Sequence, residues 1–149
     1  MASLAKSAGF DFENYQNSVK VQLHDQYLHG SLIEQIKQLA SAAAIPYTIE
    51  NKKVTIWATQ GTHDDVVIEI GPDNGMVGYP TFWEQGLIVR CEFNPAINNG
   101  RQIKITSQIP RANGTFYTTT VTHELSTYAP KGPWFTTVQT SPFAVVKAN

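Results

Sequence analysis

The chain has 149 residues, of which 42% are hydrophobic and 15% are charged, so it is long enough for one or two small folded domains. Its formal net charge of −1 gives no positive field, which excludes a general attraction to nucleic acid or to an acidic membrane. A single cysteine, Cys91, excludes an internal disulfide and a cysteine-rich zinc site. No apolar run is long enough to span a bilayer, and the first ten residues lack the apolar core of a secretory signal. We therefore expect a protein that is soluble when made, in a reducing cytoplasm.

The first half of the sequence predicts a small strand–helix–hairpin unit. Residues 19–22 alternate between apolar and polar side chains, which predicts a short strand. Residues 31–34 have the spacing of a capping box, so a helix is predicted from there to the break that Pro46 imposes. Residues 47–56 read as a hairpin, and residues 66–70 as one more strand of this half. We expect the helix to cover one face of the resulting sheet.

The second half of the sequence predicts an antiparallel β-barrel-like domain, either a small barrel or a strongly curved sheet. Short polar loops separate four predicted strands, at residues 87–93, 102–107, 115–125 and 134–140. The overall fold class is therefore α+β. We expect a first domain at residues 1–71 and a second at residues 72–149, and the sequence leaves open whether the two pack as one body.

The pair His123-Glu124 raises the question of a zinc peptidase, whose helix reads H-E-x-x-H. The second histidine position of that motif is Thr127 here. The β-branched run before the pair predicts a strand, in which successive side chains point to opposite faces. His123 and Glu124 would then be unable to share a metal and its water, so the sequence predicts a core or interface histidine.

The remaining candidates for chemistry are weak. His24 and His29 lie five residues apart on a loop, and His63 precedes the acidic pair Asp64-Asp65 without a further ligand in sight. The serines lack the G-x-S-x-G context of a nucleophile, and the glycines fit no phosphate-binding motif. We therefore expect no catalytic residue, no metal and no cofactor.

Aromatic side chains gather in two places along the chain. They are Tyr79, Phe82 and Trp83 in one segment, and Tyr128 and Trp134 in another. Exposed aromatic residues of this kind either fill pockets at protein interfaces or stack on sugar rings. The alternative is that they pack the ends of a small barrel.

Several short motifs follow one another in an order that suggests a family. They are Gly78-Tyr79-Pro80, Phe93-Asn94-Pro95, Gly100 with Ile103 and Ile105, Gly114 with Phe116, Val121 with His123 and Leu125, and Trp134-Phe135-Thr136. In this order the chain resembles the C-terminal part of tail (baseplate) hub proteins of tailed bacteriophages and related prophages, from about residue 4 to residue 141. Complete hub proteins of this kind are longer, so the resemblance implies a part of one.

The resemblance implies a structural virion component without enzymatic activity. Such hubs form a homo-trimer at the tip of the tail tube and join the tube to the spike or tip by protein–protein contacts, with barrel domains that resemble tube subunits. The partners would be other tail proteins, with no nucleic acid and no membrane, and the location would be the host cytoplasm during assembly and then the virion tail. His123 would hold a structural strand position. We expect neighbouring subunits to complete edge strands at residues 102–107 or 134–140.

Two alternatives remain beside this interpretation. The first is a carbohydrate-binding module of a phage tail protein, with Trp83, Tyr79 or Trp134 as stacking platforms. The second is a cell-wall hydrolase, for which the sequence offers neither an acid/base pair nor a nucleophile.

Overall fold

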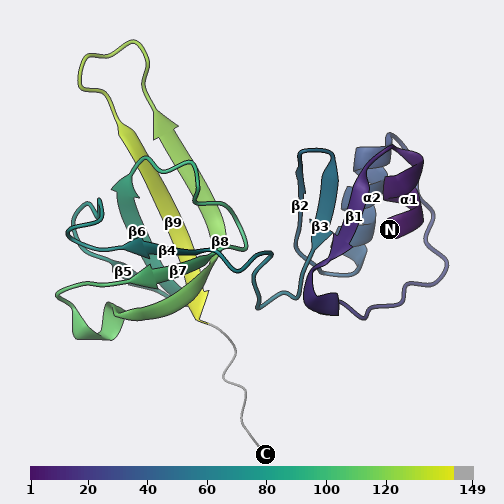
Figure 1. Ribbon diagram of the computed structural model, residues 1–149, viewed down its shortest axis with the longest axis horizontal. Coiled ribbons are helices and arrows are strands. Elements are labelled where there is room, and N and C mark those ends of the chain that lie inside the picture. The colour runs from purple at the N-terminus through teal and green to yellow at the C-terminus, as the bar shows by residue number, and fades with distance from the viewer. Residues whose placement is uncertain (143–149) are drawn as a thin grey trace, which may run out of the picture. The chain divides into compact units, whose positions relative to one another are not determined.

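In the computed structural model, residues 1–142 are described, and the chain divides into two compact units between His63 and Asp64 (Figure 1). The first unit combines short helices with a three-stranded sheet, and the second is built on a six-stranded sheet. The α+β class predicted from the sequence is confirmed. Neither α-helix of the described residues has the length and apolar character that a membrane-spanning helix needs.

The first unit contains two α-helices, three strands and a 3₁₀ turn. These elements are α1 (Ala2–Ser7), β1 (Asp11–Asn14), the turn Tyr15–Asn17, α2 (Leu32–Ala42), β2 (Tyr47–Glu50) and β3 (Lys53–Ile56). The strand order is β1-β3-β2, with β1 parallel to β3 and β2 antiparallel to it. The predicted helix and hairpin are confirmed, whereas α1 and β1 were not predicted.

Helix α2 begins with the capping box that its sequence predicts. The Ser31 hydroxyl accepts the Glu34 N–H, and the Glu34 carboxylate accepts the Ser31 N–H at 2.6 Å. The Ser31 N–H and the Ser31 hydroxyl both donate to the Glu34 carboxylate, and these two hydrogen bonds lower the pKa of Glu34 because they favour its ionised form. Ile36 of α2 packs with Ala5 of α1 and Val54 of β3 in the buried core of this unit.

The strand predicted at residues 19–22 is wrong. Residues 18–30 form neither helix nor strand. The backbone N–H and C=O of Val19 are hydrogen-bonded to the side-chain amide of Asn14 and not to a neighbouring strand. A strand needs a partner ladder, and the sequence pattern alone does not supply one. The alternation instead directs Val19, Val21 and Leu23 into an apolar pocket.

The second unit is a mixed sheet of six strands. They are β4 (Val67–Ile70), β5 (Thr81–Trp83), β6 (Gly86–Glu92), β7 (Gln102–Ile105), β8 (Gly114–Leu125) and β9 (Trp134–Pro142), in the order β4-β7-β8-β9-β6-β5. Strand β4 pairs in parallel with β7. The sequence predicts residues 66–70 as a strand of the first half and only antiparallel pairing in the second half. Strand β4 instead belongs to the sheet of the second unit and pairs in parallel, because strand order depends on contacts distant in sequence.

The sheet of the second unit curls around its core without closing. After β4 the chain runs beside β6, where the Val77 N–H donates to the Arg90 carbonyl and the Glu92 N–H to the Gly75 carbonyl, each at 2.8 Å. Strands β4 and β5 remain the two ends of the sheet, and the described residues form no closed barrel. The buried core residues are Ile70, Leu87, Val89, Cys91, Ile97, Ile103, Ile105, Ala112 and Val138.

The open edges of this sheet differ from those expected. Strand β7 lies between β4 and β8, and β9 lies between β8 and β6, so neither offers an edge to a neighbouring subunit. The expectation that residues 102–107 or 134–140 form edge strands is therefore wrong. The free edges among the described residues belong to β4, β5 and the outer half of β8.

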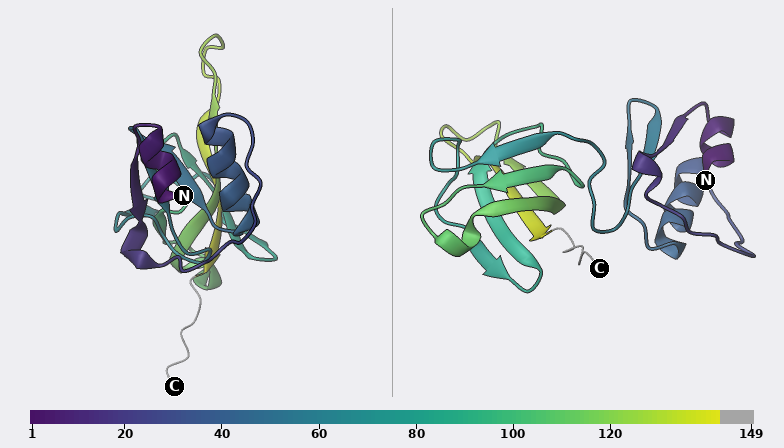
Figure 2. Two further views of the ribbon diagram at one scale, coloured as in Figure 1. Left: turned by 90° about the vertical axis from the view of Figure 1, so that its right-hand side faces the viewer. Right: turned by 60° about the horizontal axis from the view of Figure 1, so that its bottom comes forward.

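Strands β8 and β9 are the longest of the part of the chain that the structure describes, and their outer ends project beyond the rest of the second unit (Figures 1 and 2). We call residues 121–138, which include the loop Ser126–Pro133, the arm. A β-bulge precedes it, because Thr118 pairs with Thr140 whereas Thr120 pairs with Gln139. The register of β8 with β9 is therefore shifted by one residue where the arm begins.

Candidate assembly surfaces

The five aromatic residues singled out from the sequence lie in two groups within the second unit. Tyr79, Phe82 and Trp83 lie in and before β5, whereas Tyr128 and Trp134 lie on the arm. Tyr79 and Phe82 are exposed, but Trp83 is half-buried and its indole N–H donates to the Thr140 carbonyl at 3.2 Å. The structure therefore does not bring the five residues together as one platform.

An open pocket of about 350 Å³ lies beside β5. Its lining residues are Phe82, Glu84, Gln85, Gly86, Leu87, Arg111, Phe116 and Pro142. Phe82 remains 53% exposed at this pocket, so the pocket has an apolar wall in contact with water. The charged residues in this lining are Glu84 and Arg111. We call this set of residues the β5 pocket.

The arm exposes several apolar and aromatic side chains to solvent. Leu125 pairs with Trp134 across the hairpin, and both are about half exposed. The Trp134 ring lies 6.0 Å from that of Phe93, and the Trp134 indole N–H donates to the Ser126 carbonyl at 3.0 Å. At the tip, Tyr128 is 99% exposed, so its ring lies almost wholly in solvent. Exposed aromatic residues on a projecting element are typical of contact surfaces.

His123 and Glu124 point to opposite faces of the arm, as the strand prediction required. His123 Nδ1 forms a 2.9 Å hydrogen bond with the Thr136 hydroxyl, and its ring lies 5.2 Å from that of Phe93. Glu124 accepts a hydrogen bond of 2.6 Å from Arg90, whose guanidinium lies 4.4 Å above the Phe135 ring. The two neighbours therefore take part in separate structural contacts and make no common site.

The outer half of β8 has an unpaired edge. Strand β7 pairs only with residues 114–117 of β8. The Ser126 N–H donates across the hairpin, so in the alternating antiparallel ladder the backbone groups of Val121, His123 and Leu125 point away from β9. No other strand of the described residues covers them. An edge of this kind invites pairing with another chain.

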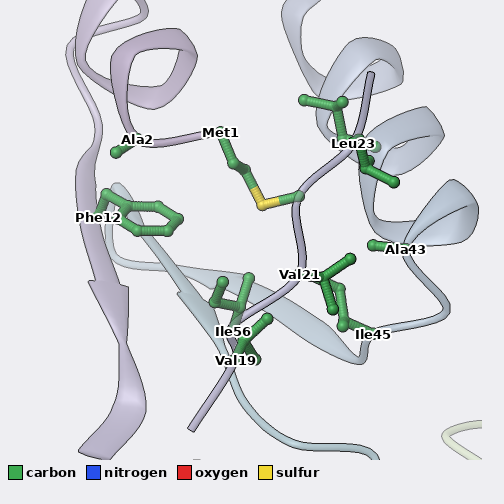
Figure 3. Close-up of a pocket in the computed structure, with 10 residues that line it drawn as sticks. Met1, Ala2, Phe12, Val19, Val21, Leu23, Ala43, Ile45 and Ile56 are labelled. Atoms are coloured by element: carbon green, nitrogen blue, oxygen red, sulfur yellow. The ribbon is translucent and has the colours of Figure 1, made fainter. Parts of the chain in front are cut away.

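The first unit contains an apolar pocket that the sequence analysis did not identify (Figure 3). It encloses about 330 Å³, and all of its lining residues are apolar: Met1, Ala2, Phe12, Val19, Val21, Leu23, Leu39, Ala43, Ile45 and Ile56. The alternation at residues 19–23 is the sequence signal of its wall, although the same pattern is also typical of a strand. With no polar side chain to orient a substrate, this pocket offers no catalytic chemistry.

The other histidines lie apart. The His63 ring packs 5.1 Å from that of Trp57, and the His29 ring stacks at 6.2 Å from that of Tyr27. His24 is exposed on the segment before α2. Within residues 1–142, no three side chains of histidine, cysteine, aspartate or glutamate are grouped so that they could hold a metal ion.

The comparisons with known proteins identify a family. The family model described as Baseplate hub gp41 matches residues 2–139, which cover both units and nearly the whole chain. No curated protein matches the chain. The match agrees with the resemblance of the motifs to tail hub proteins. The chain thus belongs to the Baseplate hub gp41 family and is a structural component of a bacteriophage tail baseplate.

Proposed function

We propose that this chain is a non-enzymatic hub subunit that joins the tail tube to the tip or spike by protein–protein contacts, as a homo-trimer in the assembled particle. The observation that carries the proposal is the arm, with its unpaired β8 edge and its exposed Leu125, Tyr128 and Trp134. A projecting hairpin with these features gains stability when a neighbouring protein covers it.

The composition of the sheet supports assembly from a soluble precursor. Both β8 and β9 contain several threonines among their apolar residues, so the strands are not apolar throughout. Interfaces that form between separately folded proteins have this mixed character. The net charge of −1 adds no strong repulsion between copies, so contacts between identical subunits are electrostatically tolerated.

Exposure of Tyr79 and Phe82 also favours a second candidate, the carbohydrate-binding module. Against it, Trp83 is half-buried and its indole N–H is already used in the contact with Thr140. A glycan array discriminates between the two functions. Binding to a host envelope sugar that Tyr79→Ala abolishes would support the module, whereas no binding to any sugar would leave the hub interpretation.

The hub proposal is tested in the phage that encodes the chain. Its gene is deleted and resupplied on a plasmid, with and without a C-terminal tag for gold labelling, and tails are examined by electron microscopy. We expect tails without a joined tip in the deletion, rescue by the plasmid copy, and label at the end of the tube. Intact tails in the deletion, or label along the tube or on the fibres, would contradict the proposal.

A further inference from the structure

The second unit exposes two aromatic surfaces of opposite shape. The arm tip, made of Leu125, Tyr128 and Trp134, projects into solvent, whereas the β5 pocket is an open hollow with Phe82 at its wall. Both surfaces leave aromatic area in contact with water. Because Tyr128 is 99% exposed, the arm of a copy does not fill that copy's own pocket.

The sizes of the two surfaces match. An apolar cavity of about 150 Å³ is enough to hold a benzene ring. The β5 pocket, at about 350 Å³, has room for the phenol ring of Tyr128 together with part of its loop. The wall formed by Phe82 and Phe116 gives that ring aromatic partners.

The charges also match. The loop Ser126–Pro133 carries a single charged side chain, Lys131, and the β5 pocket contains Glu84 and Arg111. Glu84 can pair with Lys131, and the Arg111 guanidinium is attracted to the face of a tyrosine ring. In the proposed contact Lys131 therefore has an opposite charge available in Glu84, and Arg111 has an aromatic partner in Tyr128.

We propose that the arm tip of one copy docks in the β5 pocket of the next copy, with Tyr128 as the anchor. Such a contact joins two different surfaces, so it is head-to-tail, and repeated head-to-tail contacts form a closed ring when the rotation between copies permits. Strand edges that no other part of residues 1–142 pairs with lie beside both surfaces, on β8 and on β5, and allow backbone hydrogen bonds to extend the contact. This inference rests on the proposed homo-trimer and names its interface.

The first test compares the association of three variants by light scattering over a range of concentrations. Tyr128→Ala and Phe82→Ala each remove one side of the contact, and Tyr27→Ala, at a residue 87% exposed in the first unit, is the matched control. We expect association to weaken at least tenfold in the first two variants and to be unchanged in the control. All three residues are exposed, so none of the substitutions should unfold the chain, which circular dichroism checks. Association of Tyr128→Ala equal to that of the control would overturn the proposal.

The second test captures the contact covalently and reports its direction. Thr127→Cys and Gln85→Cys chains, which keep Tyr128 and Phe82 in place, are mixed under mild oxidation, and Cys91 stays silent because it is buried. We expect a disulfide-linked dimer in the mixture and none in either variant alone, with Tyr27→Cys mixed with Gln85→Cys as the background control. Dimers of a single variant, which would mean contact between like surfaces, or no dimer in the mixture, would overturn the inference.

The two tests separate this inference from the proposed function. A chain that trimerises, but whose mixed cysteine variants do not cross-link, refutes the arm–pocket contact and leaves the hub role intact. Conversely, cross-linking in a chain that is absent from the tube end in labelled tails supports the contact and refutes the hub role.

Discussion

Cys91 illustrates at the scale of one residue how burial sets the chemistry of a side chain. The side chain is buried in the core of the second unit, and its thiol lies 3.6 Å from the Thr136 carbonyl. Burial, with a smaller contribution from the charge of Glu92, raises the pKa of the Cys91 thiol from its ordinary 9.0 to about 11. The thiol therefore remains protonated and unreactive at neutral pH.

This pKa shift predicts both reactivity and pH dependence. We expect a thiol reagent to label Cys91 far more slowly in the folded chain than in urea; equal rates would contradict the burial. Because the pKa is higher in the folded state, the unfolded chain loses its proton first as the pH rises. The contribution of Cys91 to stability is therefore complete below pH 9 and is lost between about pH 9 and 11, which urea unfolding at several alkaline pH values measures.

The sequence predicted part of the residue-level picture. It placed His123 and Glu124 on opposite faces, because strand parity is a local property. It gave no information on their partners Thr136 and Arg90, since those contacts depend on which strands pair. The exposure of Phe82 and the half-burial of Trp83, adjacent in one short strand, likewise follow from the position of β9 and not from local pattern.

At the scale of the element, the pairing of β6 with its neighbour depends on Gly86. It has φ = +155°, and a Cβ there would overlap the Thr140 carbonyl oxygen of β9. We expect Gly86→Ala to lower the free energy of unfolding by about 2–5 kcal/mol, since overpacking and backbone strain combine. Gly78→Ala is the control, because it adds strain at φ = +73° without meeting any atom within 4 Å. Equal losses in the two variants, measured by urea unfolding, would show that the overlap does not matter.

Helix α2 depends in a similar way on its N-cap residue, Ser31. Ser31→Ala removes the capping box, and we expect a loss of about 1 kcal/mol in the stability of the first unit. Ser41→Ala, at an exposed position in the same helix, should cause no loss. Because the pKa of Glu34 is lowered in the folded chain, its contribution is complete above pH 4.5 and is lost as the pH falls below that value. The difference between Ser31→Ala and wild type should therefore shrink in acid; a constant difference would contradict the role of Glu34.

Elements with strong local signals were predictable, and those fixed by distant partners were not. The capped helix and the hairpin β2–β3 are each specified by residues that lie a few positions apart in the sequence. Helix α1 has no side-chain cap, and β1 is defined by its parallel pairing with β3, about forty residues away. Residues 19–22 have a strong local signal that misleads. Their alternation is typical of a strand, but they pair with no strand and instead form part of the wall of an apolar pocket.

At the scale of the whole molecule, the two units have cores of different size. Among residues 1–142, nine buried side chains form the core cluster of the second unit, whereas the cluster of the first has three, Ala5, Ile36 and Val54. Since stability grows with buried apolar area, we expect the first unit to unfold at a lower urea concentration. Trp57 is the tryptophan of the first unit, so its fluorescence follows that unit, and Trp57→Phe leaves the signal of the second. A single coincident transition for both signals would contradict the prediction.

The bulge at Thr119 determines how the loss of one residue from β8 would change the surface of the arm. Up to Thr118, the side chains at even-numbered positions point to one face of the strand. After the extra residue, the side chains at odd-numbered positions point to that face. Losing Thr119 would leave regular pairing, in which Thr120 still lies opposite Gln139 and Glu124 opposite Phe135, so every residue that follows would keep its face. A deletion between Thr120 and Leu125 has no extra residue to remove, so it would exchange the faces of the residues on one side of it or shift the register with β9. The arm of a related hub therefore keeps its surface when one codon is lost at the bulge, and changes it when one codon is lost further along the strand.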